Sequence, residues 1–146
     1  MTNIITLLAI LLGTLGVNFT QAESFGSTPT YPPPFQAFQA QAQQSGEDWV
    51  IDIQVLPGFY LYEKDFKPQV VGMSTDESLQ WSRPALTQVE DPLRGPVNVM
   101  RAQFRTTLSS HRTEFPAGEL WLGLQGCADS GFCYPPEKRL LAIISE

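Results

Sequence analysis

The sequence predicts an all-β domain, a β-sandwich of roughly seven to nine short strands. Glycine and proline turn signals recur at short intervals between residues 45 and 136, which leaves little room for long helices. Apolar and polar residues alternate with a period of two in several of the intervening segments. This alternation is typical of strands with one buried face. The sequence contains no internal repeats that would suggest another architecture.

Residues 1–22 are predicted to be a secretory signal peptide. Residues 4–17 are uncharged and mostly apolar, and Thr20-Gln21-Ala22 then places small residues at the −3 and −1 positions of a cleavage site. The apolar run is shorter than the roughly 20 residues that a membrane span needs, and no later stretch approaches that length. We therefore expect an exported protein with no membrane span after signal removal.

A lead-in rich in proline and serine, residues 23–34, is expected to precede the domain, which occupies residues 35–146. The consecutive Pro32, Pro33 and Pro34 favour polyproline geometry and argue against a helix in the lead-in. Two alternatives remain open for it. The lead-in is either a mobile tail or an ordered strand packed on the domain.

Within the domain, three segments have clear strand patterns. Apolar residues occupy every second position of residues 49–55 and 120–124, and residues 140–144 form a short apolar run. Residues 35–44 and 97–108 are ambiguous, because each combines features of helices with features of strands. We predict strands for both.

The charge balance excludes several kinds of partner. The chain has 15 acidic and 9 basic residues, a formal net charge of −6. Nucleic acids and anionic membrane surfaces bind basic patches, so neither is an expected partner. His111 is the only histidine, which excludes the common histidine-based metal cages and catalytic triads. We expect it at the surface.

The two cysteines, Cys127 and Cys133, are six residues apart. A predicted strand ends just before Cys127, and another is expected to start near Cys133. Between them, Asp129, Ser130 and Gly131 suit the tip of a hairpin. The two sulfurs can therefore meet across the hairpin, and an exported pair is expected to be oxidised.

This cysteine pair has three possible roles. As a structural staple it would close a short loop and contribute roughly 2.4 kcal/mol, which is modest. As a redox site it would be exposed at the hairpin tip and open to exchange. A metal site of Cys127, Cys133, His111 and Asp129 is disfavoured, because five intervening residues exceed the usual two-to-four spacing. The residues alone leave staple and redox site open.

Three stretches resemble the N-terminal periplasmic domain of the thiol:disulfide interchange protein DsbD. Residues 125–137 resemble the active-site cysteine hairpin of that family, residues 58–64 the aromatic strand near it, and residues 90–95 the loop that caps its disulfide. The resemblance extends over residues 34–145. It implies an immunoglobulin-like β-sandwich with a redox-active cysteine hairpin at one end.

The resemblance also implies an activity, that of a protein-disulfide reductase-type oxidoreductase in the periplasm. In the family, this domain receives two electrons from a thioredoxin-like domain and passes them to exported thiol proteins, including disulfide isomerases and cytochrome c maturation thioredoxins. The redox-active disulfide serves without a cofactor. Family members continue into a transmembrane electron carrier and a C-terminal thioredoxin-like domain, neither of which is in this sequence. We therefore expect either that a separate protein supplies the electrons or that the chain serves another pathway.

The same resemblance assigns roles to individual residues. Cys133 forms the mixed disulfide with a partner, and Cys127 resolves it. Tyr60 and Tyr62 share one face of a strand, where they are expected to wall the site and offer hydroxyls to a partner's backbone. The other residues expected to shape the site are Asp91, Leu93, Asp129, Phe132 and Tyr134.

The loop at residues 90–95 is expected to place Leu93 on the two sulfurs. Leu93 and Arg94 stand where the family commonly has aromatic residues. Asp129, and Asp91 when the loop closes, would disfavour a nearby thiolate by like-charge repulsion. We therefore predict thiol pKa values that are not depressed, and selectivity that comes from docking.

Two rival functions differ in class from the relay. One is an immunoglobulin-like binding module whose Cys127–Cys133 bridge is permanent. The other is a scaffold or inhibitor that occupies redox partners without turning over. A reduction potential below about −300 mV would indicate a permanent bridge.

Overall fold

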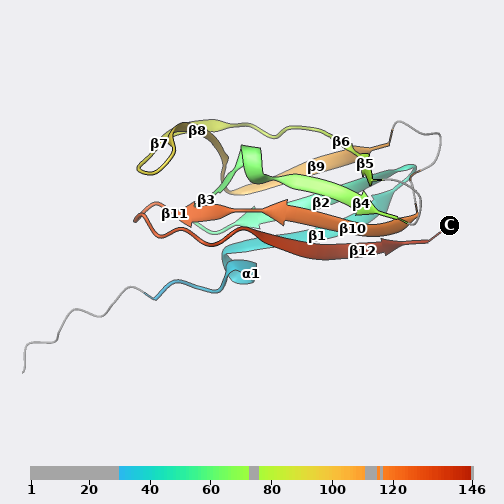
Figure 1. Cartoon of the computed structure of the whole chain (residues 1–146), viewed down its shortest axis with the longest axis horizontal. Helices are drawn as coiled ribbons and strands as arrows, with labels where there is room; N and C mark the ends of the chain where they lie inside the picture. The colour runs from blue at the N-terminus through green and yellow to red at the C-terminus, as the bar shows by residue number, and fades with distance from the viewer. Residues whose placement is uncertain (1–29, 73–75, 111–114, 116, 146) are drawn as a thin grey trace, which may run out of the picture. The chain divides into compact units, whose positions relative to one another are not determined.

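The computed structural model describes residues 30–72, 76–110, 115 and 117–145. One compact unit spans Tyr31–Glu146, and of the separate unit Met1–Thr30 only Thr30 is described. The compact unit consists almost entirely of antiparallel strands (Figure 1). Its elements are α1 (Pro34–Ala37), β1 (Phe38–Ser45), β2 (Asp48–Val55), β3 (Phe59–Tyr62), η1 (Glu63–Asp65), β4 (Lys67–Val71), β5 (Asp76–Ser78), β6 (Gln80–Trp81), β7 (Thr87–Asp91), β8 (Gly95–Met100), β9 (Gln103–Ser109), β10 (Gly118–Leu124), β11 (Gly126–Ala128) and β12 (Glu137–Ile144).

The strands form three four-stranded sheets. Two of them, with the orders β1-β2-β9-β6 and β12-β10-β4-β5, run along the length of the domain. The third, β11-β3-β8-β7, lies at the end where β7 and β11 are labelled in Figure 1. One buried cluster takes Ile51, Ile53 and Leu108 from the first sheet and Leu120 and Leu122 from the second. The two long sheets therefore pack face to face, which confirms the predicted all-β, immunoglobulin-like sandwich.

The alternating segments form strands as predicted. Residues 49–55 lie in β2, residues 120–124 in β10, and residues 140–144 in β12. The described residues form twelve strands, more than the seven to nine predicted. The difference arises because several pairings last only two or three residues, as in β5, β6 and β11.

Two local predictions need correction. The prolines do not exclude a helix, because Pro34 begins α1 at a position where a missing N–H costs nothing. Residues 35–37 are therefore helical, and the predicted strand begins only at Phe38. Residues 97–108 are extended as predicted but form two strands, β8 and β9, separated near Ala102, which has a φ of 59°.

Candidate functional site

The candidate site is a disulfide between Cys127 and Cys133. The two residues form an isolated antiparallel bridge, and backbone hydrogen bonds of 2.7 and 3.0 Å flank the pair. They thus occupy a non-hydrogen-bonded position of the hairpin, where opposed side chains lie closest. Their Cα atoms are 4.0 Å apart. The predicted cross-hairpin bridge is confirmed, but Cys127 lies inside β11, and the next long strand, β12, starts only at Glu137.

The hairpin tip is tied to its surroundings on both sides. Gly131 has a φ of 96° and donates its N–H to the Ala128 carbonyl (2.9 Å), which closes the turn. Asp129 donates its N–H to the Gly58 carbonyl (2.8 Å), just before β3. Its carboxylate forms an ion pair with Arg101 (2.8 Å). Asp129 is therefore a surface anion with a cationic partner rather than an isolated charge.

The two sulfur-bearing residues are buried to different extents. Cys127 is 0% exposed, whereas Cys133 is half-buried. The expectation of an exposed disulfide is therefore wrong for Cys127. The physical reason is that β11 pairs with β3, so Cys127 lies opposite Tyr60 and packs in a cluster with Tyr62 and Val99.

Close approach of β11 to β3 depends on Gly126. A Cβ atom at this position would lie 2.3 Å from the Tyr60 carbonyl oxygen and 2.6 Å from Cζ of Phe38. Neither group has room to withdraw, since Phe38 is 1% exposed in the core. The glycine before Cys127 thus permits the packing that buries its sulfur.

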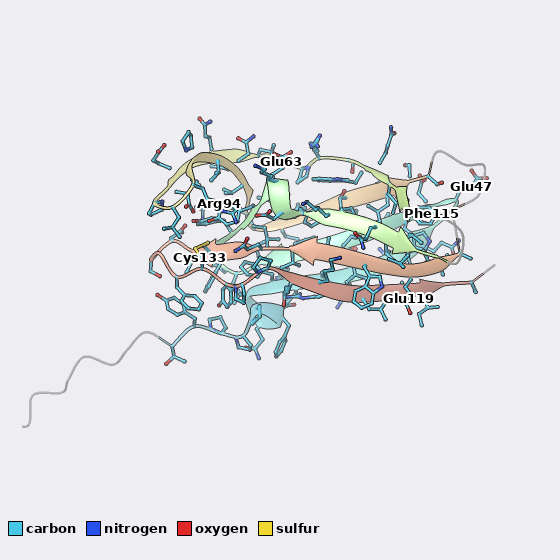
Figure 2. The ribbon with its side chains drawn as sticks, viewed as in Figure 1. Glu47, Glu63, Arg94, Phe115, Glu119 and Cys133 are labelled. Carbon is cyan, nitrogen blue, oxygen red and sulfur yellow. A yellow bond between two sulfur atoms is a disulfide. The ribbon has the colours of Figure 1, made fainter. Side chains whose placement is uncertain are left out.

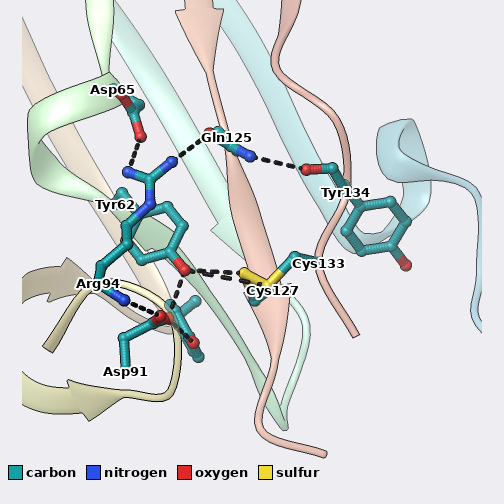
Figure 3. Close-up of polar contacts among 9 residues, drawn as sticks. Tyr62, Asp65, Asp91, Arg94, Gln125, Cys127, Cys133 and Tyr134 are labelled. Carbon is teal, nitrogen blue, oxygen red and sulfur yellow. Dashed lines mark hydrogen bonds and ion pairs between the residues drawn. A yellow bond between two sulfur atoms is a disulfide. The ribbon is translucent and has the colours of Figure 1, made fainter. Parts of the chain in front are cut away.

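Tyr60 and Tyr62 lie on one face of β3, as predicted, with ring centroids 5.5 Å apart. The Tyr62 hydroxyl oxygen is 3.0 Å from Sγ of Cys127 and 3.9 Å from Sγ of Cys133 (Figure 3). Tyr62 therefore contacts the disulfide directly.

Asp91 is a buried carboxylate, 3% exposed, behind these tyrosines. Its Oδ2 accepts hydrogen bonds from the hydroxyls of Tyr60 (3.0 Å) and Tyr62, and its Oδ1 accepts from the backbone N–H groups of Leu93 (2.8 Å) and Arg94 (2.9 Å). The hydrogen bond from Tyr62 is the main cause that holds the pKa of Asp91 below its ordinary value, and the hydrogen bonds from Leu93, Tyr60 and Arg94 lower it further. The two tyrosine hydroxyls therefore donate their protons to Asp91 rather than to a partner's backbone carbonyl in this structure.

The Tyr62 hydroxyl has one proton, and the Asp91 carboxylate is a far better acceptor for it than a disulfide sulfur. Burial, followed by the bond to Asp91, raises the pKa of Tyr62, so the proton stays on the phenol. The lone pairs of that oxygen remain available to the sulfur. A reduced Cys127 can then donate its S–H to Tyr62, which favours the neutral thiol.

Leu93 does not cover the sulfurs in the expected way. It is 84% exposed in the short turn between β7 and β8, so nearly all of its side chain faces solvent. Oδ1 of Asp91 fixes this turn by accepting hydrogen bonds from its backbone N–H groups, and Gly95 ends the turn in the left-handed conformation, with a φ of 71°. The neighbouring Arg94 lies nearer the site, with its guanidinium 4.1 Å from the centroid of the Tyr62 ring.

Arg94 is a contributor that sequence reasoning missed. Its guanidinium forms an ion pair with Asp65 (2.6 Å) and donates to the side-chain carbonyl of Gln125 (2.6 Å). Gln125 in turn donates to the backbone carbonyl of Tyr134 (3.0 Å), the residue after Cys133. The only sequence signal was the position of Arg94 in a loop already assigned to the site.

The end of the lead-in packs on the outside of the hairpin. The Tyr31 ring stacks on Phe132 with centroids 4.2 Å apart, and its hydroxyl lies 2.8 Å from Oγ of Ser130. Tyr134 donates its hydroxyl to the Pro32 carbonyl (2.6 Å). Residues 31–33 thus pack on the domain but form no strand, so neither alternative describes this end of the lead-in as stated. Residues 23–29 and the predicted signal peptide lie outside the described residues.

The described part of the chain holds no group of three or more His, Cys, Asp or Glu residues that could bind a metal. His111 lies outside the described residues. Among the helices that the structure describes, none has the length and apolar character needed to cross a membrane.

Several known proteins similar to this chain are thiol:disulfide interchange proteins. The chain is 32% identical over 113 residues to the thiol:disulfide interchange protein DsbD of Klebsiella pneumoniae, covering 77% of this chain and 18% of that protein. It is 37% identical over 90 residues to DsbD 2 of Pseudomonas aeruginosa, covering 62% of this chain and 14% of that protein. The chain thus spans about a fifth or less of the curated relatives that it matches.

Solved structures agree on the fold. The reduced DsbD N-terminal domain of Neisseria meningitidis matches with a TM-score of 0.68 and 23% identity, covering 78% of this chain and 90% of that one. A complex between the DsbD and PilB N-terminal domains of the same species matches with a TM-score of 0.62 and 20% identity, covering 75% and 84%. The family model for the N-terminal region of the thiol:disulfide interchange protein DsbD matches residues 28–145. This chain therefore belongs to the DsbD N-terminal domain family.

Proposed function

We propose that this chain is a periplasmic dithiol–disulfide relay, which takes electrons from a thioredoxin-like donor and passes them to exported thiol proteins through Cys127 and Cys133. The observation that carries the proposal is the unequal burial of the pair. Cys133 is half-buried at the end of the domain, whereas Cys127 is 0% exposed. An incoming thiolate must approach a sulfur in line with the bond that breaks, and of the two residues only Cys133 is partly exposed to solvent.

The exchange then proceeds in two balanced steps. A donor thiolate attacks Sγ of Cys133, the bond to Cys127 breaks, and Cys127 leaves as a thiolate that takes up a proton. The second thiol of the donor then attacks the donor's first sulfur, which is bonded to Cys133 in the mixed disulfide. The donor disulfide forms, and Cys133 is released as a thiol. The donor is oxidised by two electrons and the pair is reduced. The reverse sequence with an oxidised acceptor restores the Cys127–Cys133 bridge.

Selectivity in this mechanism comes from docking. Asp91 is an anion behind the site, and the Tyr62 oxygen, 3.0 Å from Sγ of Cys127, is placed to accept a hydrogen bond from a reduced Cys127, so neither group promotes a thiolate. The surface around Cys133 offers contacts instead. Leu93 is 84% exposed in the turn between β7 and β8 and Phe132 is 39% exposed in the hairpin, which gives a partner two apolar side chains to contact.

A protein partner is supported by the similar structure of a DsbD N-terminal domain in complex with a PilB N-terminal domain. For the present chain, the donor class we propose is thioredoxin-like, and the acceptors are isomerases or cytochrome c maturation proteins. The predicted signal peptide and the family membership together support the periplasmic location.

Trapping tests the order of attack. Cys127→Ser, mixed with an oxidised thioredoxin-like domain, is expected to accumulate a mixed disulfide through Cys133. Cys133→Ser is expected to trap none, because Cys127 is buried. Trapping by Cys133→Ser alone would reverse the two assignments.

Two further measurements test the relay itself. The reduction potential is expected between about −270 and −120 mV, the range of thioredoxin-like proteins, whereas a value below about −300 mV would indicate a permanent structural bridge. Stopped-flow mixing with a reduced thioredoxin-like domain is expected to reduce the bridge with turnover. A bridge that stays intact for hours would reject the relay, and binding without electron transfer would indicate an inhibitor.

A further inference from the structure

We propose that Arg94 is a positioning residue that holds Tyr62 against the disulfide and restrains attack on Cys133. The proposal deepens the proposed function and rests on it for its biological meaning. Its physical basis is a chain of contacts at the end of the domain that carries Cys133. Figure 2 shows Arg94 and Cys133 at this end, away from Glu119 and Phe115.

Arg94 connects three segments that are distant in the sequence. It lies in the turn between β7 and β8, its ion-pair partner Asp65 lies in η1, and its second acceptor, Gln125, joins β10 to β11. Gln125 then reaches the backbone carbonyl of Tyr134. The turn is thus linked through two side chains to the backbone that follows Cys133 (Figure 3).

The guanidinium also covers the Tyr62 ring at 4.1 Å. Tyr62 is 2% exposed, and its hydroxyl touches Sγ of Cys127 and approaches Sγ of Cys133. Leu93 is turned to solvent, so the side chain of this turn that packs on Tyr62 is Arg94. Displacing Arg94 frees one face of the Tyr62 ring, and movement of that ring uncovers the sulfurs.

An arginine suits this role better than a lysine. Its planar fork donates to Asp65 through one terminal nitrogen and to Gln125 through the other while its flat face stacks on the aromatic ring. The hydrogen bond to Asp65 is also the main cause that raises the pKa of Arg94, so the guanidinium stays charged at any physiological pH. Because the Arg94–Asp65 pair is about one-third exposed, salt screens it in part.

The test is the rate at which an uncharged phosphine, tris(hydroxypropyl)phosphine, reduces the bridge in the intact chain. An uncharged reductant removes any salt effect on its own approach. Arg94→Met keeps an apolar stem over the Tyr62 ring but loses both polar contacts. The matched control is Arg105→Met, which removes an arginine–carboxylate pair with Asp52 (2.7 Å) on the β2–β9 face.

We expect Arg94→Met to be reduced about two- to five-fold faster than the wild type, the range that the loss of a partly exposed ion pair supports. Arg105→Met should match the wild type. Raising KCl from 20 to 500 mM should accelerate the wild type and leave Arg94→Met unchanged. Arg94→Lys, which keeps the charge without the fork, should be intermediate.

Equal rates for Arg94→Met and wild type would overturn the proposal, and so would slower reduction of the variant. Should Arg94→Met fail to fold, Gln125→Ala removes the hydrogen bonds that connect Arg94 to the Tyr134 carbonyl. An unchanged reduction rate in Gln125→Ala would also overturn the proposal. The phosphine needs no protein partner. A chain that is never reduced by a thioredoxin-like domain would therefore reject the proposed function while the phosphine rates still decide the role of Arg94.

Discussion

Replacing Asp91 by asparagine tests whether its buried charge organises the site. Asparagine keeps a carbonyl oxygen for the N–H groups of Leu93 and Arg94, so the turn is preserved. On the other side, an amide group now faces Tyr60 and Tyr62. The two tyrosine hydroxyls therefore lose a charged acceptor without any loss of side-chain volume.

The magnitude follows from these two bonds. A hydrogen bond to a charged group contributes about 1.5–3 kcal/mol, against about 1 kcal/mol for a neutral one. Two such changes give an expected loss of about 2 kcal/mol in the free energy of unfolding at pH 7. Asp52→Asn is the control, because Asp52 forms an ion pair at the surface with Arg105, and its loss is expected to cost about 0.5 kcal/mol.

The pH dependence has a definite sign. The folded pKa of Asp91 lies below its unfolded value of about 3.9, so its contribution to stability is complete above about pH 5. It is lost as the pH falls through the folded pKa. Urea titrations of the oxidised proteins should therefore show the gap between wild type and Asp91→Asn shrinking from pH 5 to pH 2.5. A gap no larger than that of Asp52→Asn at pH 7, or one that persists unchanged in acid, would refute the reasoning.

Three further outcomes can be measured. Gly126→Ala should lower the free energy of unfolding by about 2–3 kcal/mol, because its Cβ would collide with a backbone oxygen at 2.3 Å. Gly46 has a φ of 67° and open space around it, so Gly46→Ala should lower the free energy of unfolding by only about 1 kcal/mol. Equal losses of unfolding free energy for the two variants in urea titrations would contradict the steric argument. Tyr31→Ala should speed hydrogen exchange at the Ala128 amide, which bonds to the Phe132 carbonyl, and leave the amides of β2 unchanged. In Cys127→Ser, alkylation of Cys133 by iodoacetamide should have a pH midpoint at or above about 8.5, and a midpoint below about 7.5 would contradict docking-based selectivity.

The sandwich was predictable because its signals are local. Alternation in residues 49–55 and 120–124 reports which side chains face the core: β2 buries Ile51, Ile53 and Val55, and β10 buries Leu120, Leu122 and Leu124. The spacing of Cys127 and Cys133 likewise fits a hairpin of any fold. The helical start at Pro34 was missed because a proline argues against a helix interior but not against its first position.

The surroundings of the disulfide were less predictable, since they depend on contacts between distant segments. Tyr62 and Asp91 are 29 residues apart, as are Asp65 and Arg94, and no periodicity connects them. The error on Leu93 has a related origin. Asp91 takes up both N–H groups of the turn, and the turn then presents Leu93 to solvent and places Arg94 against Tyr62.

The unequal burial of the cysteines explains why one pair can resemble both a staple and a relay. To reach Cys127, a thiol would have to separate β11 from β3 and displace core side chains such as Val99. The contacts nearest Cys133 at the rim are weaker, namely those of Arg94 with Asp65 and Gln125 and the stacking of Tyr31 on Phe132, the residue before Cys133. Each of these contacts is worth only about 1 kcal/mol. In the relay that we propose, Cys133 is therefore attacked while the sandwich stays folded, and Cys127 stays sheltered for the resolving step.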